Sequence, residues 1–522
     1  MASTEAENGN DLSEIQKFFD NNSVFLTGGT GFLGNLLLEK LLRACPGIKK
    51  IYVLTREKKG KDPNERFKAI FDDVLFERMK LECPDYATKV RAIIGDCMKP
   101  NLGLSEQDRN ILINEVNTVF HVAATVRFDA HLRTAVNINI RATNDLLEIA
   151  HSMKHLKAFI HVSTAYSNCA ERKVVDEKFY VPPVSPDALM KLTDSLSDEI
   201  IERITPQLIK PWPNTYAFTK AIAEDVVRTK GKAMPLSIVR PAIVIATAKE
   251  PIAGWINNFY GPTGVVAGAG LGLLRTIHAD GDCIAELVPA DNVVNAIIAA
   301  AWDINKNWEQ PEKLITAEEN EQKPAKDFNE IPIYNYVSSN SKPLKWKEFM
   351  AYNELAEPEI PSVLAIWIYG LTINKHKSIH QLYCIFLHLI PALIVDTFAR
   401  IIGKEPKLWN AYQKIHKFSD VISYFSTKQW TFLDSNTKDL FNRLDIKDKR
   451  LFDFDLTKLD WKQYFYYHIR GIRVYLVHDS LDTVPKGLEK RRRLMIAHYS
   501  LVTLFWCFLL YVAFLICGWI FK

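Results

Sequence analysis

Short apolar runs rich in β-branched residues alternate with segments of helical periodicity from Ser23 to about Asp303. Continuous apolar runs are typical of parallel strands buried on both faces, and their alternation with helices is typical of doubly wound sheets. The fold class is therefore expected to be α/β with a doubly wound parallel sheet. The pattern predicts strands at residues 23–28, 50–56, 90–96, 118–124, 158–164 and 236–243, with helices such as 35–45 and 142–153 between them.

Two stretches interrupt this alternation. Residues 168–214 are mostly helical in pattern with a proline-rich entrance, and residues 247–285 are rich in glycine and apolar side chains. Both follow strands at the end of the sheet where ligands bind in such folds. Each is expected to be either a cover over the substrate or a mobile surface insertion, and 168–214 is assigned as a lid.

The other segments suggest the domain limits. A chain of 522 residues exceeds what one core holds, so more than one domain is expected. Residues 1–22 are polar and predict a flexible lead-in, and residues 23–345 form the sheet domain, which ends in a polar stretch with a last strand at 333–339. Residues 346–482 are aromatic and helical in pattern, which predicts a second, helical domain.

The C-terminal end predicts a membrane anchor. Residues 494–521 contain no formally charged side chain, and they exceed the roughly 20 residues that span a bilayer. Lys486 and residues 490–493 put five cations before this segment, and only Lys522 follows it. By the positive-inside rule the folded body faces the cytosol, as in a tail-anchored protein of the peroxisomal or endoplasmic reticulum membrane. The basic flank favours the peroxisome mildly.

A second apolar segment, residues 379–395, is near the lower length limit for a span and includes His380 and His388. Asp396 and Arg400 follow at helical spacing. An amphipathic helix that lies on the membrane or lines an acyl groove is favoured over a true span.

Composition excludes several classes of function. A net charge of +4 is small for this length, so no nucleic-acid partner is implied. The eight cysteines are scattered without a CxxC pair, and no histidine cluster has metal-ligand spacing, so no metal is expected. A reducing, cytosol-facing compartment fits this usage.

The segment VFLTGGTGFLG predicts a dinucleotide-binding turn of the Rossmann type between a strand and an amphipathic helix. Gly28 permits the tight turn, Gly31 lets the backbone approach a pyrophosphate, and Gly34 permits close packing of helix and strand. With these glycines, the turn residues assigned to the cofactor are Thr27, Thr30, Phe32 and Leu33.

The end of the next strand selects the cofactor. Arg56 stands where NAD enzymes place a carboxylate, with Lys58 and Lys59 behind it. A guanidinium suits a ribose 2′-phosphate, so NADPH is predicted. Further assignments to the cofactor rest on position in the fold: Asp96 beside the adenine, and Ala123 and Ala124 where the backbone lies against the cofactor.

Tyr216 and Lys220 lie four residues apart, so they share one face of a predicted helix. A phenol is a poor proton donor at neutral pH unless a nearby ammonium stabilises the phenolate. Lys220 can supply that charge and bind the nicotinamide ribose, and Ser163, at the end of the preceding strand, can polarise the same carbonyl oxygen. Tyr216, Lys220 and Ser163 are therefore the candidate catalytic residues.

These motifs together resemble an extended member of the short-chain dehydrogenase/reductase superfamily. The resemblance narrows to the eukaryotic fatty acyl-CoA reductases and covers nearly the whole chain after the lead-in. The segments that carry it are TGGTGFLG, LTR, GDCMKPNLGL, HVAATVRFD, HVSTAYSN, YAFTKAIAE, SIVRPAIV, GWINNFYGPTG, VPADNVVN and LHLIPALIVDTFARIIGKEPKL.

The resemblance implies reduction of a long-chain acyl-CoA to a primary alcohol with NADPH, by a membrane-associated protein facing the cytosol. Two hydride transfers would pass through a bound aldehyde, with coenzyme A released after the first. Arg240 and residues 254–264 match the family without an assigned role. Chain-length preference and homo-oligomerisation are left open.

Two other functions compete with this interpretation. A membrane-anchored reductase of sterol or other lipid carbonyls would use the same three catalytic residues. An NADPH-binding scaffold without activity would not need all three. Cys169, near the end of the strand that carries Ser163, is the one thiol considered as a covalent nucleophile, and a buried packing role is favoured for it.

Overall fold

The computed structural model describes residues 12–57, 60, 62–308 and 331–520. The chain forms two compact units, and neither is continuous in sequence. The first comprises residues 1–252, 286–344 and 429–459, and the second comprises residues 253–285, 345–428 and 460–522. The expected boundary at residue 345 therefore separates only part of the chain, because residues 253–285 and 429–459 each join the unit on the other side of it.

A parallel sheet of seven strands forms the centre of the first unit, in the order β11-β7-β5-β4-β1-β2-β3. The chain winds from β1 to β3 on one side of β1 and from β4 to β11 on the other side, which is the arrangement of a doubly wound Rossmann sheet. The predicted strands are confirmed. They are β1 Ser23–Thr27, β2 Lys50–Thr55, β3 Val90–Ile94, β4 Thr118–His121, β5 Ala158–Val162, β7 Leu236–Pro241 and β11 Ile333–Tyr336.

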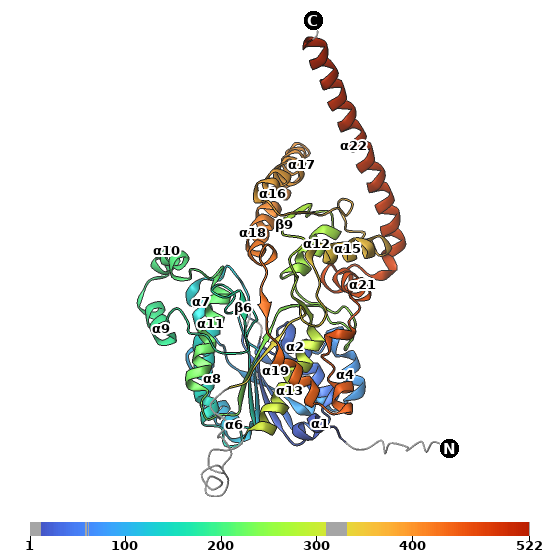
Figure 1. The fold of residues 1–522 in the computed structure, drawn as a ribbon. Helices are drawn as coiled ribbons and strands as arrows, with labels where there is room; N and C mark the ends of the chain where they lie inside the picture. Colours follow the sequence, from blue (N-terminus) through green and yellow to red (C-terminus); the bar gives the residue numbers. More distant parts are fainter. Residues whose placement is uncertain (1–11, 58–59, 61, 309–330, 521–522) are drawn as a thin grey trace, which may run out of the picture. The chain divides into compact units, whose positions relative to one another are not determined.

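Helices cover both faces of this sheet (Figure 1). Helices α2 Phe32–Ala44 and α13 Ala290–Asn307 pack together on one face, and α8 Ala142–His151 and α11 Thr215–Lys230 pack together on the other. The other helices of the unit are α1 Glu14–Phe19, α3 Pro63–Ile70, α4 Glu77–Glu82, α5 Tyr86–Lys89, α6 Glu106–Glu115, α7 Leu132–Val136, α9 Pro186–Ser195, α10 Asp198–Leu208, α19 Ser435–Arg443 and α20 Ile446–Leu451.

Part of the expected flexible lead-in is folded. Ser13 caps helix α1 in a capping box with Gln16, and Ile15 and Phe19 are fully buried. The backbone N–H of Ile15 donates to the carboxylate of Asp448. The lead-in therefore ends before residue 13, and residues 1–11 lie outside the described part of the chain.

The segment 168–214 is mostly helical, as predicted, and contains α9 and α10. Its first residues form β6 Val174–Val175, which pairs in parallel with β13 Thr431–Phe432. This pairing joins the proposed lid to residues 429–459. The same late segment also packs on the first unit through α19, which contacts α13 and β11. Two further short strands of the unit, β8 Ile243–Ile245 and β10 Leu287–Pro289, also pair in parallel.

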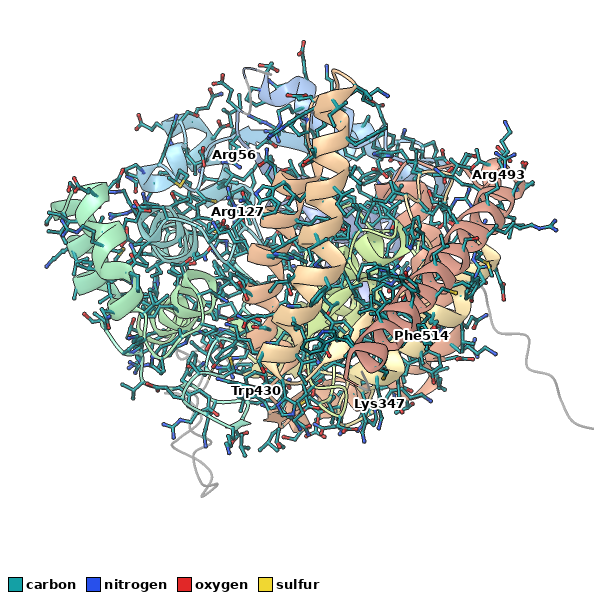
Figure 2. All side chains as sticks on the ribbon, turned by 90° about the horizontal axis from the view of Figure 1, so that it is seen from above. Arg56, Arg127, Lys347, Trp430, Arg493 and Phe514 are labelled. Carbon is teal, nitrogen blue, oxygen red and sulfur yellow. The ribbon has the colours of Figure 1, made fainter. Side chains whose placement is uncertain are left out.

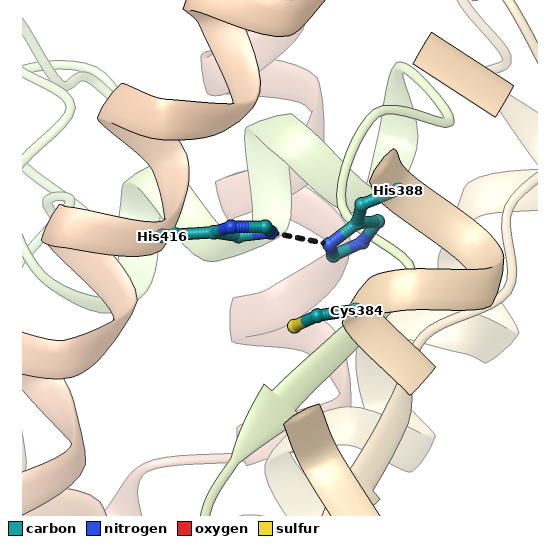
Figure 3. A group of neighbouring side chains, drawn as sticks. All are labelled: Cys384, His388 and His416. Atoms are coloured by element: carbon teal, nitrogen blue, oxygen red, sulfur yellow. Dashed lines mark hydrogen bonds between the residues drawn. The ribbon is translucent and has the colours of Figure 1, made fainter. Parts of the chain in front are cut away.

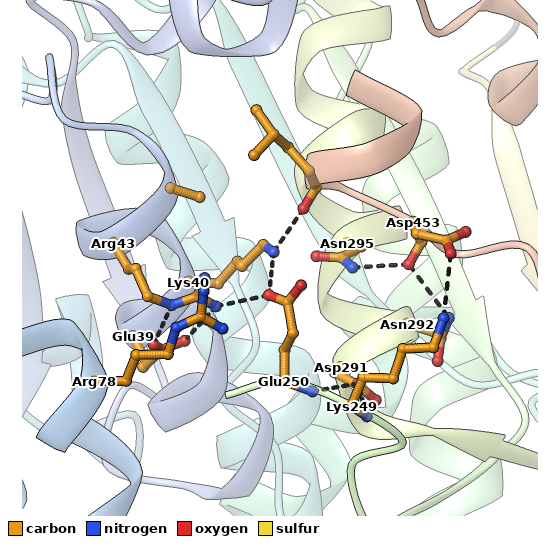
Figure 4. A network of polar contacts seen from close by, with 12 residues as sticks. Glu39, Lys40, Arg43, Arg78, Lys249, Glu250, Asp291, Asn292, Asn295 and Asp453 are labelled. Carbon is orange, nitrogen blue, oxygen red and sulfur yellow. Dashed lines mark hydrogen bonds and ion pairs between the residues drawn. The ribbon is translucent and has the colours of Figure 1, made fainter. Parts of the chain in front are cut away.

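A polar network holds α2 against neighbouring segments of the first unit (Figure 4). Lys40 Nζ donates to Glu250 Oε2 and to the carbonyl of Leu451, each at 2.6 Å, and Arg43 Nη2 donates to the same Glu250 oxygen at 2.8 Å. Burial alone would raise the pKa of Glu250, but the two cations outweigh it and lower the value to about 2. The carboxylate thus stays charged and ties the segment after β8 to the helix behind the dinucleotide turn.

The second unit is mainly helical, as predicted for most of residues 346–482. Its helices are α12 Pro262–Gly270, α15 Trp346–Ala356, α16 Lys377–Cys384, α17 Ile390–Ile401, α18 Leu408–Ser426, α21 Trp461–Gly471 and α22 Val484–Ile520. One parallel strand pair, β9 Thr276–His278 with β12 Thr372–Asn374, joins residues 253–285 to this unit.

Two helical stretches of this unit are long and apolar enough to cross a membrane, Lys377–Ile401 with 25 residues and Leu481–Trp519 with 39. The second contains residues 494–519 of the expected anchor and also the basic residues before it. Arg493 and Phe514, labelled in Figure 2, lie in its basic and apolar parts.

Candidate active site

The dinucleotide turn has the geometry that its glycines require. Gly28 has φ +76°, and a Cβ there would lie 2.7 Å from the backbone nitrogen of Ala123. A Cβ on Gly34 would lie 2.1 Å from the carbonyl oxygen of Gly28. Both positions therefore exclude a side chain, the first because of backbone strain and contact with the end of β4, the second because helix and turn touch.

The N-terminus of α2 opens at this turn. Gly31 is the N-cap and is exposed, so it brings no side chain over the helix end. Thr27 is buried, with its hydroxyl 2.8 Å from His121 Nδ1, and it accepts a bond from the N–H of Ala123. Thr30, Phe32 and Leu33 are half-buried around the opening. A helix N-terminus with bare backbone attracts an anion, so the residues fit a dinucleotide pyrophosphate.

Arg56 and Asp96 lie at the same edge of the sheet. Arg56 is exposed just after β2 (Figure 2), and Asp96 is half-buried after β3. Both are close enough to affect Cys97: burial raises the pKa of that thiol to about 12, Asp96 adds to the rise, and Arg56 opposes it. The carboxylate of Asp96 also accepts the N–H of Met98 at 2.9 Å. Lys58 and Lys59 lie outside the described residues.

Tyr216 lies in the first turn of α11, where the side chain of Asn214 caps the helix. Burial raises the pKa of Tyr216 to about 12, against a side-chain hydrogen bond with Thr164 that lowers it. The ring of Phe128 lies beside the phenol, with 5.9 Å between ring centroids. Thr164 follows the end of β5, so a strand end and a helix start bring these two hydroxyl groups together.

Lys220 lies one turn further along α11 and is fully buried. Its Nζ donates to the carbonyl oxygen of Val162 at 2.7 Å. Burial lowers the pKa of Lys220 to about 8, and the charge of Glu224 opposes that fall. The ammonium is thus directed at the end of β5, and the charge of Glu224 acts on it from one turn further along α11.

The hydroxyl of Ser163 does not point where the sequence suggested. It donates to Glu224 Oε1 at 2.5 Å, and Glu224 lies one turn beyond Lys220 on α11. The hydroxyl beside the phenol of Tyr216 belongs to Thr164, so Thr164 joins Ser163 as a candidate for the group that polarises the carbonyl oxygen.

Glu224 is the centre of a buried polar network that the sequence analysis missed. Besides Ser163, its carboxylate accepts from Ser167 at 3.0 Å and from Asn168 at 3.2 Å. Arg240 Nε and Nη2 donate to its two oxygens at 2.9 and 2.7 Å. A charged residue inside the continuous apolar run of β7 was the available signal, since such a residue is rarely buried without a partner.

Arg240 also holds the start of the 168–214 segment. The guanidinium is fully buried and donates to the carbonyl oxygens of Asp176 and Lys178, each at 2.9 Å. One side chain therefore links β7, α11 and the entrance of the proposed lid. This gives Arg240, whose role the sequence left open, a structural task.

Cys169 is buried, as expected for a packing residue. Its carbonyl oxygen accepts the indole N–H of Trp430 at 2.8 Å (Trp430 is labelled in Figure 2). Trp430 directly precedes β13, so this bond strengthens the link between residues 168–214 and 429–459.

Family models match most of the chain. A domain described as "Male sterility protein", of the NAD-binding kind, matches residues 26–297, and a second domain with the same description matches residues 387–479. The first match contains the glycine turn, Arg56, Thr164, Tyr216 and Lys220. The residues that line the turn thus fit a nicotinamide dinucleotide both by geometry and by family.

Relatives and solved structures agree with this. The chain is 40% identical over 497 residues to fatty acyl-CoA reductase wat of Drosophila melanogaster, which covers 95% of this chain and 92% of the relative. It is 36% identical over 499 residues to fatty acyl-CoA reductase 1 of Homo sapiens, covering 95% and 93%. Two solved structures share the fold. The terminal R domain of the myxalamid biosynthetic pathway is 18% identical with a TM-score of 0.51, and the match covers 87% of this chain and 91% of that one. The reductase (R) domain of a nonribosomal peptide synthetase from Mycobacterium tuberculosis is 16% identical with a TM-score of 0.53, and the match covers 87% and 92%. The chain therefore belongs to the fatty acyl-CoA reductase family.

Proposed function

We propose that this protein reduces a long-chain fatty acyl-CoA to the primary fatty alcohol, with NADPH as the reductant. The observation that carries the proposal is the pairing of Tyr216 with the hydroxyl of Thr164 on a helix that also carries the buried Lys220. These groups lie at the carboxyl ends of β5 and its neighbours, where doubly wound sheets bind their ligands. Relatives named fatty acyl-CoA reductases support the choice of substrate.

NADPH rather than NADH is proposed from Arg56. Its guanidinium follows β2 and is exposed, in the position where a 2′-phosphate of the adenosine ribose would lie. Thr27, Gly28 and Gly31 would hold the pyrophosphate, and Ala123 and Ala124 would lie against the cofactor. Asp96 would accept the adenine amine with the carboxylate oxygen that Met98 leaves available.

Bound NADPH would supply a hydride to the acyl carbon in each of two rounds. In the first, the hydroxyls of Tyr216 and Thr164 stabilise the negative charge that develops on the thioester oxygen. When that tetrahedral oxyanion collapses, the carbon–sulfur bond breaks and coenzyme A leaves as the thiol with a proton from solvent, which yields the aldehyde. In the second round Tyr216 donates its proton to the aldehyde oxygen, which yields the alcohol.

Lys220 would act on this chemistry through its charge. Its pKa of about 8 leaves most of the side chain protonated at neutral pH. An ammonium near the phenol lowers the cost of forming the phenolate and could donate to the nicotinamide ribose. Glu224, held by Arg240, keeps that charge in place one turn below.

We propose further that α22 anchors the protein in a membrane and that the folded body faces the cytosol. No position of the apolar window within Leu481–Trp519 is buried, and the cations of residues 490–493 precede it. Such a helix needs a hydrocarbon environment, and the cations favour the cytosolic side. Whether the membrane is peroxisomal or of the endoplasmic reticulum would follow from imaging the tagged full chain against markers of both organelles.

The decisive test is incubation of purified protein with NADPH and a panel of acyl-CoAs, with the products identified by mass spectrometry. Alcohol from long-chain substrates is expected. Tyr216→Phe keeps the ring and removes only the donor, so it should bind NADPH normally and form no alcohol. Reduction of a sterol ketone but of no acyl-CoA would contradict the proposal in favour of a carbonyl reductase. NADPH binding without any product would leave only a scaffold.

A further inference from the structure

The helix at residues 377–401 buries its polar side chains and exposes its apolar ones, which is the reverse of a helix on the surface of a water-soluble protein. It runs continuously through α16, a π-helical turn at Ile385–Leu389 and α17. Its buried positions recur every fourth residue and are mostly polar: His380, Cys384, His388, Ala392 and Asp396. Its exposed positions include twelve large apolar side chains: Ile379, Leu382, Tyr383, Ile385, Phe386, Leu387, Ile390, Leu393, Ile394, Val395, Phe398 and Ile401.

The buried polar stripe is satisfied by partners in the same unit. The carboxylate of Asp396 accepts the N–H groups of residues 407, 408 and 409 at 3.1, 3.0 and 2.8 Å, so it caps the start of α18. His380 Nδ1 lies 3.1 Å from the hydroxyl of Thr276 on β9, and His380 Nε2 lies 3.4 Å from Cys384 Sγ. These contacts set the rotation of the helix, and the apolar residues are thereby turned outward.

Cys384, His388 and His416 form a compact group whose ligand atoms lie within 4.8 Å of one another, which suggests a metal site (Figure 3). Their hydrogen bonds argue against it. The backbone N–H of Arg275 donates to His388 Nε2 at 2.9 Å, so the proton of the neutral ring is on Nδ1. That Nδ1 donates to His416 Nε2 at 2.9 Å. The two nitrogens that would face a metal thus share a hydrogen bond, and this bond joins the π-helical turn Ile385–Leu389 to α18.

We propose that the apolar face of helix 377–401 is immersed in the surface of a phospholipid bilayer, on the same side as the folded body, without crossing it. Soluble proteins rarely expose a continuous apolar patch of this extent, and polar residues turned inward with apolar residues outward are typical of protein surfaces that face lipid. The proposal rests on the anchoring by α22, which keeps this unit at a membrane.

The depth of the helix is limited by its neighbour in the fold. Helix α18 packs against α17, and its exposed face carries Gln413, Lys414, Lys417 and Asp420. These side chains would be costly in the hydrocarbon core, so the pair of helices cannot enter it together. Although its 25 residues are long enough to span, the helix therefore lies in the interface, where Lys377, Arg400 and Lys404 at its ends can meet anionic headgroups.

Photo-crosslinking of the full chain in phospholipid vesicles tests this contact. Phe386 and Phe398 are replaced in turn by p-benzoyl-phenylalanine. Both side chains are exposed, so the larger aromatic group of the crosslinker has room there. Phe514 on α22 is the positive control, and Lys414 on the polar face of α18 is the matched negative control. Crosslinks to radiolabelled acyl chains are expected from positions 386 and 398 at a level comparable to 514, and at background from 414.

Two results would overturn the proposal. One is lipid labelling at background level from both positions 386 and 398 while position 514 labels strongly. Crosslinks from 386 and 398 to a second copy of the chain in place of lipid would be such a result. The other concerns topology: a protease site inserted after Lys404 should be cut from outside sealed vesicles that display the folded body outside. Protection of that site would mean that the helix spans. Neither readout uses catalysis, so failure here is distinguishable from failure of the proposed reductase activity.

Discussion

Removal of the Thr164 hydroxyl is the sharpest test of how the active site is built. Thr164→Val keeps the branched shape and deletes only the group that bonds to Tyr216. Ser163→Ala, one residue away, deletes a hydroxyl that bonds to Glu224 instead. The two variants therefore separate the hydroxyl beside Tyr216, which we propose to contact the reacting oxygen, from a hydroxyl that bonds to the buried carboxylate of Glu224.

Thr164→Val is expected to lower the reaction rate, and Ser163→Ala is expected to lower the stability of the fold. Loss of one donor to a developing oxyanion costs about 10²–10³ in kcat, or roughly 2.7–4 kcal/mol, and this is the loss expected for Thr164→Val. For Ser163→Ala, Glu224 Oε1 still accepts from Ser167 at 3.0 Å and from Arg240 at 2.9 Å. A lost hydrogen bond to a charged group costs about 1.5–3 kcal/mol of folding free energy. The effect of Ser163→Ala should therefore appear as a lower midpoint of unfolding in urea and only weakly in kcat.

The assay measures a single turnover: enzyme with bound NADPH is mixed with excess acyl-CoA, and oxidation of the NADPH is monitored as the loss of nicotinamide fluorescence. Thr164→Ser, which keeps a hydroxyl, is the rescue control and should recover much of the rate lost in Thr164→Val. The reasoning is refuted if Ser163→Ala slows hydride transfer a hundredfold while Thr164→Val turns over normally. It is equally refuted if Thr164→Ser is as slow as Thr164→Val.

Three further predictions follow from the same structure. Arg56→Asp should reverse the preference for NADPH over NADH in kcat/KM, because a carboxylate repels the 2′-phosphate; an unchanged ratio would contradict the cofactor assignment. Arg240→Met leaves Glu224 charged and buried, so the free energy of unfolding in urea should fall by about 3–5 kcal/mol, and adding Glu224→Gln should restore part of it. Because Lys220 loses its proton as pH rises through about 8, kcat/KM for NADPH should fall above that pH; a flat profile to pH 9.5 would argue against a charged Lys220.

Much of the fold was predictable because its signals are local. Each strand of the sheet is a continuous apolar run, and the glycines of the turn between β1 and α2 stand at spacings that few other structures require. The long apolar helix at the C-terminal end followed from composition alone, since its residues carry no formal charge over a length sufficient to span a bilayer. Tyr216 and Lys220 were likewise placed on one helix by their separation of four residues.

The hydroxyl that lies beside Tyr216 was not predictable in the same way. Ser163 and Thr164 are adjacent and chemically similar, and the choice between them depends on which side of the strand end α11 covers. The partner of Arg240 is a carboxylate on α11, and its other acceptors are carbonyl oxygens in the 168–214 segment. No period in the sequence relates these positions, because the contacts arise only after the helices have packed.

The same division applies to the whole chain. Periodicity, glycine spacing and the absence of charge specify the doubly wound sheet, the dinucleotide turn and the C-terminal helix, since each is encoded within a few consecutive residues. Packing decides which side chains meet: Thr164 with Tyr216, Arg240 with Glu224, and the histidines of helix 377–401 with α18. The physical reason is that a residue's side of a strand or helix is set locally, whereas its partner is set by elements distant in sequence, as the pairing of β6 with β13 shows.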